Sequence, residues 1–127
     1  MNPADLRYDK EHEWVRVEGD SAVIGISDFA QDQLGEVVYV DLPSVGDVLA
    51  VGETFGEIES VKSVSELFAP VSGTVVEVND ELDSAPESIN SDAYGAGWMV
   101  KIKLADPAEL DGLMSSVEYD AFVANEA

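Results

Sequence analysis

The strongest constraint on the fold is a series of short segments in which apolar and polar residues alternate. Residues 13–17, 22–26 and 98–104 show the pattern clearly, and Gly, Pro, Asp or Ser bound each of them. A period of two is typical of strands that bury one face and expose the other. Similar short segments at 37–40, 48–50, 54–60, 63–68 and 74–78 predict a small β sandwich or barrel.

Helical signals are confined to three places. Ser27 or Asp28 can cap a short helix that ends near Leu34, with Gly35 as its C-terminal stop. Asp106 followed by Pro107, and the run 115–118, resemble helix starts near the C-terminus. Residues 83–97 carry neither pattern and are expected to form an irregular loop. The sequence therefore predicts a mainly β fold with a short inserted helix and C-terminal helices.

The chain length suits one domain. A chain of 127 residues buries roughly two-thirds of its extended surface on folding, enough for one core. No linker or low-complexity tract divides it, so 1–127 is predicted to be a single domain. We expect a β core at about 12–104 and a helical segment at about 106–124.

Composition excludes several classes of function. The chain has no cysteine, which excludes disulfide frameworks, thiolate zinc sites and cysteine nucleophiles. Six basic residues against 27 acidic ones give a net charge of −21, which argues against binding to nucleic acid or to an anionic membrane. The first ten residues lack the apolar segment of a signal peptide, and we expect a cytoplasmic protein.

The acidic residues are spread along the whole chain. A solvated acidic surface repels itself, and dissolved salt screens that repulsion. With four lysines only, the sequence predicts adaptation to molar salt, as in a halophile. In so acidic a chain a pair of carboxylates carries little information, and no metal-ligand cluster or Ser-His-Asp order accompanies one. An acid–base enzyme is therefore a weak alternative.

Lys62 is the only basic residue between Arg16 and Lys101. It lies between two predicted strands, 54–60 and 63–68, where a tight turn would project it into solvent. A lysine side chain there offers a flexible stem whose amine can be acylated. An ordinary solubilising turn lysine is the plainer interpretation of the turn alone.

The residues around Lys62 resemble the lipoylation site of glycine cleavage system H proteins. The similar segments span roughly residues 7 to 123 and occur in the same order as in that family. They are 12–15, 24–27, 30–31, 34–40 with 42–43 and Gly46, 59–66, 69–73, 89–90 and 97–99.

The resemblance implies a lipoyl/biotinyl hammerhead fold, also called a barrel-sandwich hybrid, and a carrier that is not an enzyme. Lipoic acid would be attached to Lys62 and would carry the aminomethyl group of glycine. The implied partners are the P protein (glycine decarboxylase, with pyridoxal phosphate), the T protein (aminomethyltransferase), the L protein (dihydrolipoyl dehydrogenase) and a lipoate-attachment enzyme. The resemblance also makes Glu13 and Glu66 candidates for lining the groove that receives the loaded arm.

Other interpretations remain open at this point. A biotinyl domain would have methionines beside the lysine, where this chain has Val61 and Ser63. A lipoyl domain of a 2-oxoacid dehydrogenase would lack the N-terminal strand and the C-terminal helices. The chain could also donate lipoyl groups to other enzymes in a relay, or be a salt-adapted interaction module without a cofactor. His12 could be a catalytic base, although a lone histidine beside Trp14 is more often structural.

Overall fold

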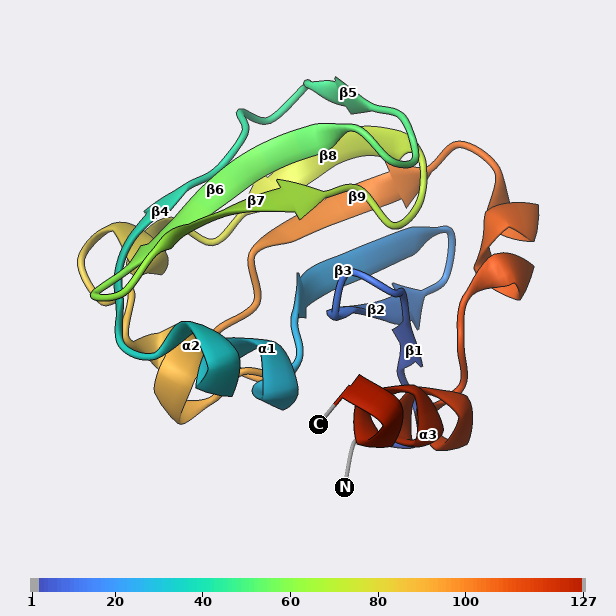
Figure 1. The fold of residues 1–127 in the computed structure, drawn as a ribbon. Coiled ribbons are helices and arrows are strands. Elements are labelled where there is room, and N and C mark those ends of the chain that lie inside the picture. The colour runs from blue at the N-terminus through green and yellow to red at the C-terminus, as the bar shows by residue number, and fades with distance from the viewer. Residues whose placement is uncertain (1–2, 127) are drawn as a thin grey trace.

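A computed structural model describes residues 3–126 and contains two antiparallel sheets (Figure 1). The larger sheet has the strand order β1-β2-β3-β9-β8-β5, and the smaller has the order β4-β6-β7. The strands are β1 (Arg7–Tyr8), β2 (Glu13–Glu18), β3 (Ser21–Ile26), β4 (Val37–Asp41), β5 (Val48–Leu49), β6 (Thr54–Ser60), β7 (Val64–Phe68), β8 (Gly73–Val78) and β9 (Val100–Leu104). The α-helices are α1 (Asp28–Leu34), α2 (Ser88–Ser91) and α3 (Ser116–Glu126), and the 3₁₀ helices are η1 (Asp80–Asp83) and η2 (Pro107–Gly112). The predicted mainly β fold, with an inserted helix and C-terminal helices, is confirmed.

The two sheets pack face to face and enclose the main core. In Figure 1 the strands β6 and β7 lie across β8 and β9. Ile24 and Ile102 from the larger sheet and Ile58 from the smaller are fully buried in one cluster. Alternation of apolar and polar residues therefore specifies which face of each strand is inside.

Helix α1 begins and ends where the sequence predicts. The Ser27 side chain accepts a hydrogen bond from the N–H of Ala30, and the Gly35 N–H donates to the Gln31 carbonyl. Gly35 has a φ of 81°, a conformation that residues with a Cβ atom rarely adopt. This stop turns the chain into β4, beside the turn between β6 and β7.

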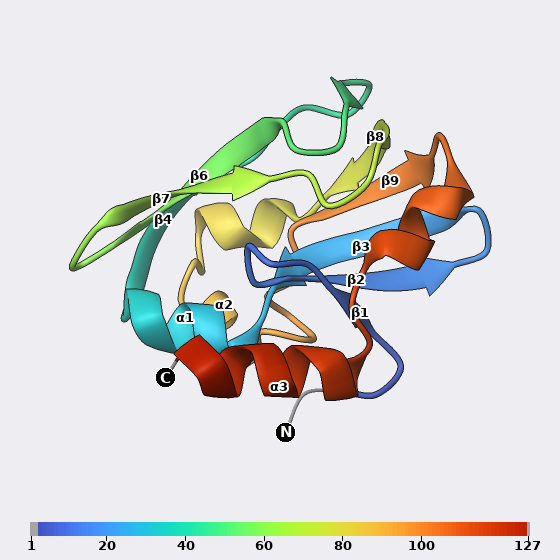
Figure 2. The same ribbon diagram turned by 45° about the vertical axis from the view of Figure 1, so that its right-hand side comes forward.

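Helix α3 is fixed by a reciprocal cap and by aromatic packing. The Ser115 hydroxyl accepts from the Glu118 N–H, and the Glu118 carboxylate accepts from the Ser115 N–H. Tyr119 stacks on Tyr8 with ring centroids 4.5 Å apart. Figure 2 shows α3 lying beside the N-terminal strands, where it covers a second, smaller core.

Three local features differ from the sequence predictions. The expected loop at 83–97 contains the short helix α2, which is held by the buried Ile89 and by hydrogen bonds of Asn90. The first C-terminal helix, η2, is a 3₁₀ helix. The short strand β1 was not predicted; it pairs with β2, and Tyr8 also exchanges backbone hydrogen bonds with Met114. Tertiary contacts decide each of these segments.

In the part of the chain that the structure describes, no helix is both long enough and apolar enough to cross a membrane.

Candidate functional site

The turn that carries Lys62 is held by one buried hydroxyl. Ser60 Oγ accepts hydrogen bonds from the N–H groups of Lys62 and Ser63, at 3.2 and 3.1 Å. The Ser60 N–H donates to the Ser63 carbonyl at 2.8 Å, and the Val61 N–H donates to the Glu36 carbonyl at 3.0 Å. The turn is therefore fixed internally and tied to the segment that follows α1.

Lys62 itself is exposed, as predicted, and its stem lies against Gly35. A Cβ atom on Gly35 would be 3.0 Å from Lys62 Cε and 3.7 Å from Lys62 Cδ. The absent side chain at Gly35 leaves room for the methylene groups of the lysine. Gly35 thus ends α1 and also provides the surface along which the lysine stem lies.

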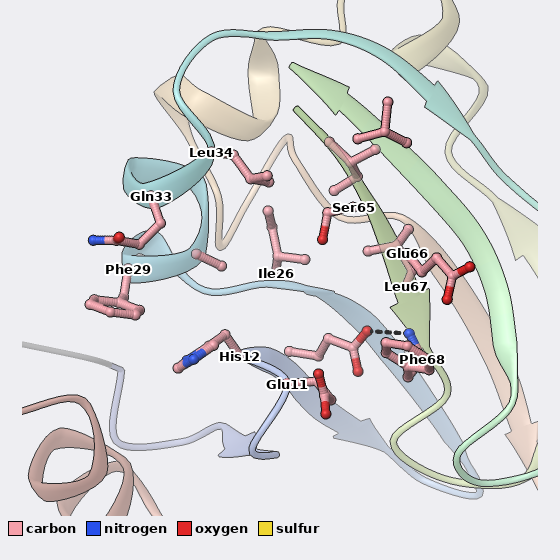
Figure 3. Close-up of a pocket in the computed structure, with 14 residues that line it drawn as sticks. Glu11, His12, Ile26, Phe29, Gln33, Leu34, Ser65, Glu66, Leu67 and Phe68 are labelled. Carbon is pink, nitrogen blue, oxygen red and sulfur yellow. Dashed lines mark hydrogen bonds between the residues drawn. The ribbon is translucent and has the colours of Figure 1, made fainter. Parts of the chain in front are cut away.

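A cavity of about 710 Å³ opens beside this turn. Helix α1 contributes Phe29, Ala30, Gln33 and Leu34, β7 contributes residues 64–68, and Ile26, Ile58 and residues 11–13 complete it. Figure 3 shows α1 on one side of the cavity and β7 on the other, with His12 and Glu11 below. Most of the lining is apolar, and its polar side chains come chiefly from the N-terminal segment and β7.

Glu13 is the buried acid of this cavity. Only 1% of its surface is exposed. Its Oε2 atom accepts a hydrogen bond from the Phe68 N–H at 2.8 Å, the dashed line in Figure 3. Its Oε1 atom has no hydrogen-bond partner among the described residues. Burial, and after it the hydrogen-bonding interaction with the Asp9 side chain and the charge of that carboxylate, raise the pKa of the Glu13 carboxyl to about 11, although the bond from Phe68 acts in the opposite direction.

Glu66 lines the same cavity from β7, so the structure brings the two predicted groove residues together. Unlike Glu13, Glu66 is exposed, and its Oε2 atom accepts a bond from the Thr54 hydroxyl at 3.4 Å. Leu34 and Val64 are also lining residues, and they lie next to Gly35 and near Lys62 in the sequence. The cavity therefore begins where the lysine stem passes α1.

His12 joins the cavity to α3 instead of standing as an isolated base. Its Nδ1 atom lies 2.8 Å from the Tyr119 hydroxyl, which in turn lies 2.7 Å from the Ser27 hydroxyl. The His12 ring also packs against Phe29 and Phe122. His12 has a φ of 67°, which is uncommon for a residue with a side chain. This structural role agrees with the interpretation favoured from the sequence.

Asn90 is a supporting residue that no local sequence pattern indicates. Its Oδ1 atom accepts from the Val37 N–H at 2.8 Å, and its Nδ2 atom donates to the Gly35 carbonyl at 2.8 Å and to the Gln31 side chain at 2.9 Å. Asn90 is 55 residues from Gly35 in the sequence, so no local pattern could have revealed these contacts. It holds the end of α1 and the start of β4 beside the Lys62 turn.

Comparison with known proteins identifies the family. The family model of the glycine cleavage H-protein matches residues 6–126. The glycine cleavage system H protein of Symbiobacterium thermophilum is 60% identical over 120 residues, covering 94% of each chain. That of an Anaeromyxobacter species is 58% identical over 124 residues, covering 98% of this chain and 97% of the relative. This chain belongs to the glycine cleavage H-protein family.

The fold agrees with this assignment. The crystal structure of a glycine cleavage system H protein from Mycobacterium marinum superposes with a TM-score of 0.88 at 38% sequence identity. The match covers 96% of this chain and 98% of the other. The predicted barrel-sandwich fold is therefore confirmed, and so is the function predicted from the resemblance: the protein is a lipoyl carrier of glycine cleavage. Proteins of this family are carrier subunits that work with the other components of that system.

Proposed function

We propose that lipoic acid is attached in amide linkage to Lys62 Nζ, and that this lysine is the arm that carries the aminomethyl group of glycine. The supporting observation is the position of Lys62. It is exposed on a turn held by Ser60, and its stem lies along Gly35, the neighbour of Leu34, which lines a cavity with a buried acid. An amine in this position is open to an attachment enzyme, and its stem can reach both solvent and the cavity.

The residues present fit this prosthetic group. Bound lipoic acid supplies a disulfide that accepts electrons and the aminomethyl group. The chain itself has no cysteine, so this sulfur chemistry has to come from the prosthetic group. Apolar side chains line much of the cavity, namely Ile26, Phe29, Leu34, Ile58 and Leu67. Such walls suit the hydrocarbon part of the arm and exclude water.

The two acids of the cavity are suited to hold an amine. Glu13 Oε1 is buried without a hydrogen-bond partner in the described chain, and it can accept a hydrogen bond from an N–H group. Glu66 lies on the exposed side of the same cavity, where its carboxylate attracts a cation through solvent. Glu13 therefore binds the amine directly, and Glu66 draws it toward the cavity.

The chain performs no catalysis in this scheme. Tethering keeps the cargo at high local concentration near each partner in turn. The proposed partners are the P, T and L proteins, and a lipoate-attachment enzyme modifies Lys62. We place this work in the cytoplasm, without nucleic-acid or membrane binding, in keeping with the net charge of −21.

Mass spectrometry of protein from its native host tests the attachment. Acylation of Lys62 blocks tryptic cleavage there, so residues 17–101 are expected as one peptide with the mass of a lipoyl group added. A biotinyl increment would assign the chain to carboxylation instead. Complete cleavage after Lys62, in cells that are degrading glycine, would contradict the proposal.

The Lys62→Arg variant tests the function. Arginine keeps the charge and the turn but lacks the amine that accepts a lipoyl group, so glycine cleavage with the three partners should stop. Lys103→Arg is the matched control, because Lys103 is exposed on β9 and does not line the cavity. Glycine cleavage by Lys62→Arg at the unmodified rate would rule out Lys62 as the arm.

A further inference from the structure

The cavity beside Lys62 contains a carboxyl group in an unusual setting. Glu13 is 1% exposed, and one of its two oxygens has no partner in the described chain. A buried carboxylate is strongly disfavoured unless positive charge or several hydrogen-bond donors compensate it. Glu13 accepts one backbone hydrogen bond, from the Phe68 N–H, and its other hydrogen-bonding neighbour is the acidic side chain of Asp9. One backbone N–H and an acidic neighbour do not compensate a buried negative charge.

The described surroundings supply no lysine or arginine side chain that could compensate it. From the N-terminal segment, the charged or titratable neighbours are Asp9, Glu11 and His12, and from β7 the neighbour is Glu66. The lining residues from β3, α1 and β6 are all uncharged. No lysine or arginine lines the cavity within the described residues. Asp9 Oδ1 already accepts from the N–H groups of Glu11 and Glu13.

Such a setting favours the neutral carboxylic acid while the cavity is empty. Both burial and the nearby acids raise the pKa of Glu13, and they act in the same direction. A primary ammonium group inside the cavity would reverse the balance, because it brings a positive charge and N–H donors to the unpartnered oxygen. The occupant and the proton then compete for the same atom.

We propose that Glu13 is protonated in the empty cavity and that entry of a primary ammonium group expels this proton to solvent. The exchange is Glu13–COOH plus R–NH₃⁺ giving the ion pair Glu13–COO⁻ with R–NH₃⁺ plus H⁺. Only the O–H bond breaks, and its electron pair stays on the carboxylate. The inference rests on the proposed function, because the arm on Lys62 supplies the ammonium group.

The exchange gives the cavity selectivity for the charged state of the arm. An arm without an amine meets a neutral acid and gains no ion pair. An arm with an ammonium group gains one, at the cost of releasing a proton. Docking should therefore strengthen about tenfold per pH unit while the amine remains protonated, and should level off above the amine's own pKa.

The protonation state of Glu13 can be observed directly by carbon-13 NMR. The lipoylated chain, labelled at glutamate side-chain carboxyls, is recorded at neutral pH before and after loading with glycine through the decarboxylase, which is then removed. We expect one carboxyl signal at the position of a protonated acid, which moves to that of a carboxylate on loading. Glu13→Gln identifies the signal by its loss, and Gln keeps an oxygen that can accept from the Phe68 N–H.

Glu77→Gln is the matched control, because Glu77 is exposed on β8 and does not line the cavity. That variant should keep both the protonated signal and its shift on loading. A Glu13 signal that is ionised before loading, or that stays protonated after loading, overturns the proton exchange even where the arm docks.

Intact mass, measured on the same samples, separates this result from a failure of the proposed function. Absence of the lipoyl group or of the aminomethyl increment on Lys62 refutes the proposed function, and the inference with it. Where both mass increments are present, the NMR signal of Glu13 alone tests the proton exchange. A repeat of the loaded spectrum between pH 6 and pH 8 should show the docked fraction falling as the pH is lowered in the parent chain. Loss of that pH dependence in Glu13→Gln is expected.

Discussion

The stem of Lys62 lies on Gly35, with Lys62 Cε 3.0 Å from the place that a Cβ atom on Gly35 would occupy. The glycine is needed twice, once for its positive φ at the end of α1 and once for the space it leaves. These two requirements can be separated by experiment.

Gly35→Ala should displace the lysine stem. Any residue with a Cβ atom at this φ costs about 1 kcal/mol or more in stability. Gly46→Ala is the control, because Gly46 also has a positive φ but nothing within 4 Å of an added Cβ. Urea unfolding should show similar losses for both variants. Only Gly35→Ala should speed the spontaneous loss of the aminomethyl group from the isolated loaded protein; equal rates in the two variants would contradict a role for Gly35 in seating the arm.

Glu13→Gln should change how stability depends on pH. The pKa of Glu13 is raised to about 11 in the folded chain, so the folded state holds a proton that the unfolded state releases above its ordinary pKa. Because of Glu13, the free energy of unfolding therefore falls as the pH rises from about 5 toward 11, by up to about 1.4 kcal/mol per pH unit. In urea unfolding at pH 5, 7 and 9, the stability of the variant relative to the parent chain should increase at each step. A difference that is constant with pH would mean that Glu13 is ionised in the folded chain.

Asn90→Ala should loosen the junction between α1 and β4. It removes bonds to the Val37 N–H and the Gly35 carbonyl, and leaving these partly buried backbone groups unpaired costs about 1 kcal/mol each. Ser91→Ala is the control, since Ser91 is an exposed neighbour on the same helix. Urea unfolding measures the stability, and amide exchange at Val37 should rise in Asn90→Ala alone. Unchanged exchange at Val37 would refute this role.

Tyr119→Phe should uncouple His12 from Ser27. The hydroxyl of Tyr119 lies between them, at 2.8 and 2.7 Å, while the ring stack on Tyr8 does not require it. We expect a loss of about 1–2 kcal/mol, since a buried polar group loses its partner. Val117→Ala, at a position 76% exposed on the same helix, should be nearly neutral. Equal thermal midpoints for the two variants would show that the hydroxyl contributes nothing.

Salt should stabilise the folded chain. With a net charge of −21, self-repulsion is strong at low ionic strength, and added salt screens it. Unfolding midpoints measured from tens of millimolar to molar sodium chloride should rise steadily. A midpoint that does not change with salt would exclude the proposed adaptation to molar salt.

Local sequence signals predicted most of the fold. Strands β2 to β9, the Ser27 cap and the Gly35 stop follow from residues close together in the chain, and so does the Lys62 turn. The resemblance then named Glu13 and Glu66 as groove residues, and both line the cavity. Their roles there stay predictions that the proposed variants can test.

The sequence could not show that Glu13 is buried and Glu66 exposed. Glu13 is one of 27 acidic residues, and no neighbouring residue in the sequence indicates its burial. The burial depends on β7 and α1, which pack over the start of β2. Asn90 and Tyr119 escaped detection for the same reason, since their partners lie 53 and 92 residues away at Val37 and Ser27. Long-range hydrogen bonds are set by the fold and have no sequence period.

The Ser60 hydroxyl, which holds the turn from inside, determines how the cargo can move. Because the backbone under Lys62 is clamped, the arm turns about a stationary pivot, and all of its freedom lies in side-chain bonds. The distance that the arm can reach is then set by its own length, measured from the end of the hairpin of β6 and β7. A partner enzyme has to bring its active site within that distance of the hairpin, so the carrier determines how closely each partner must dock.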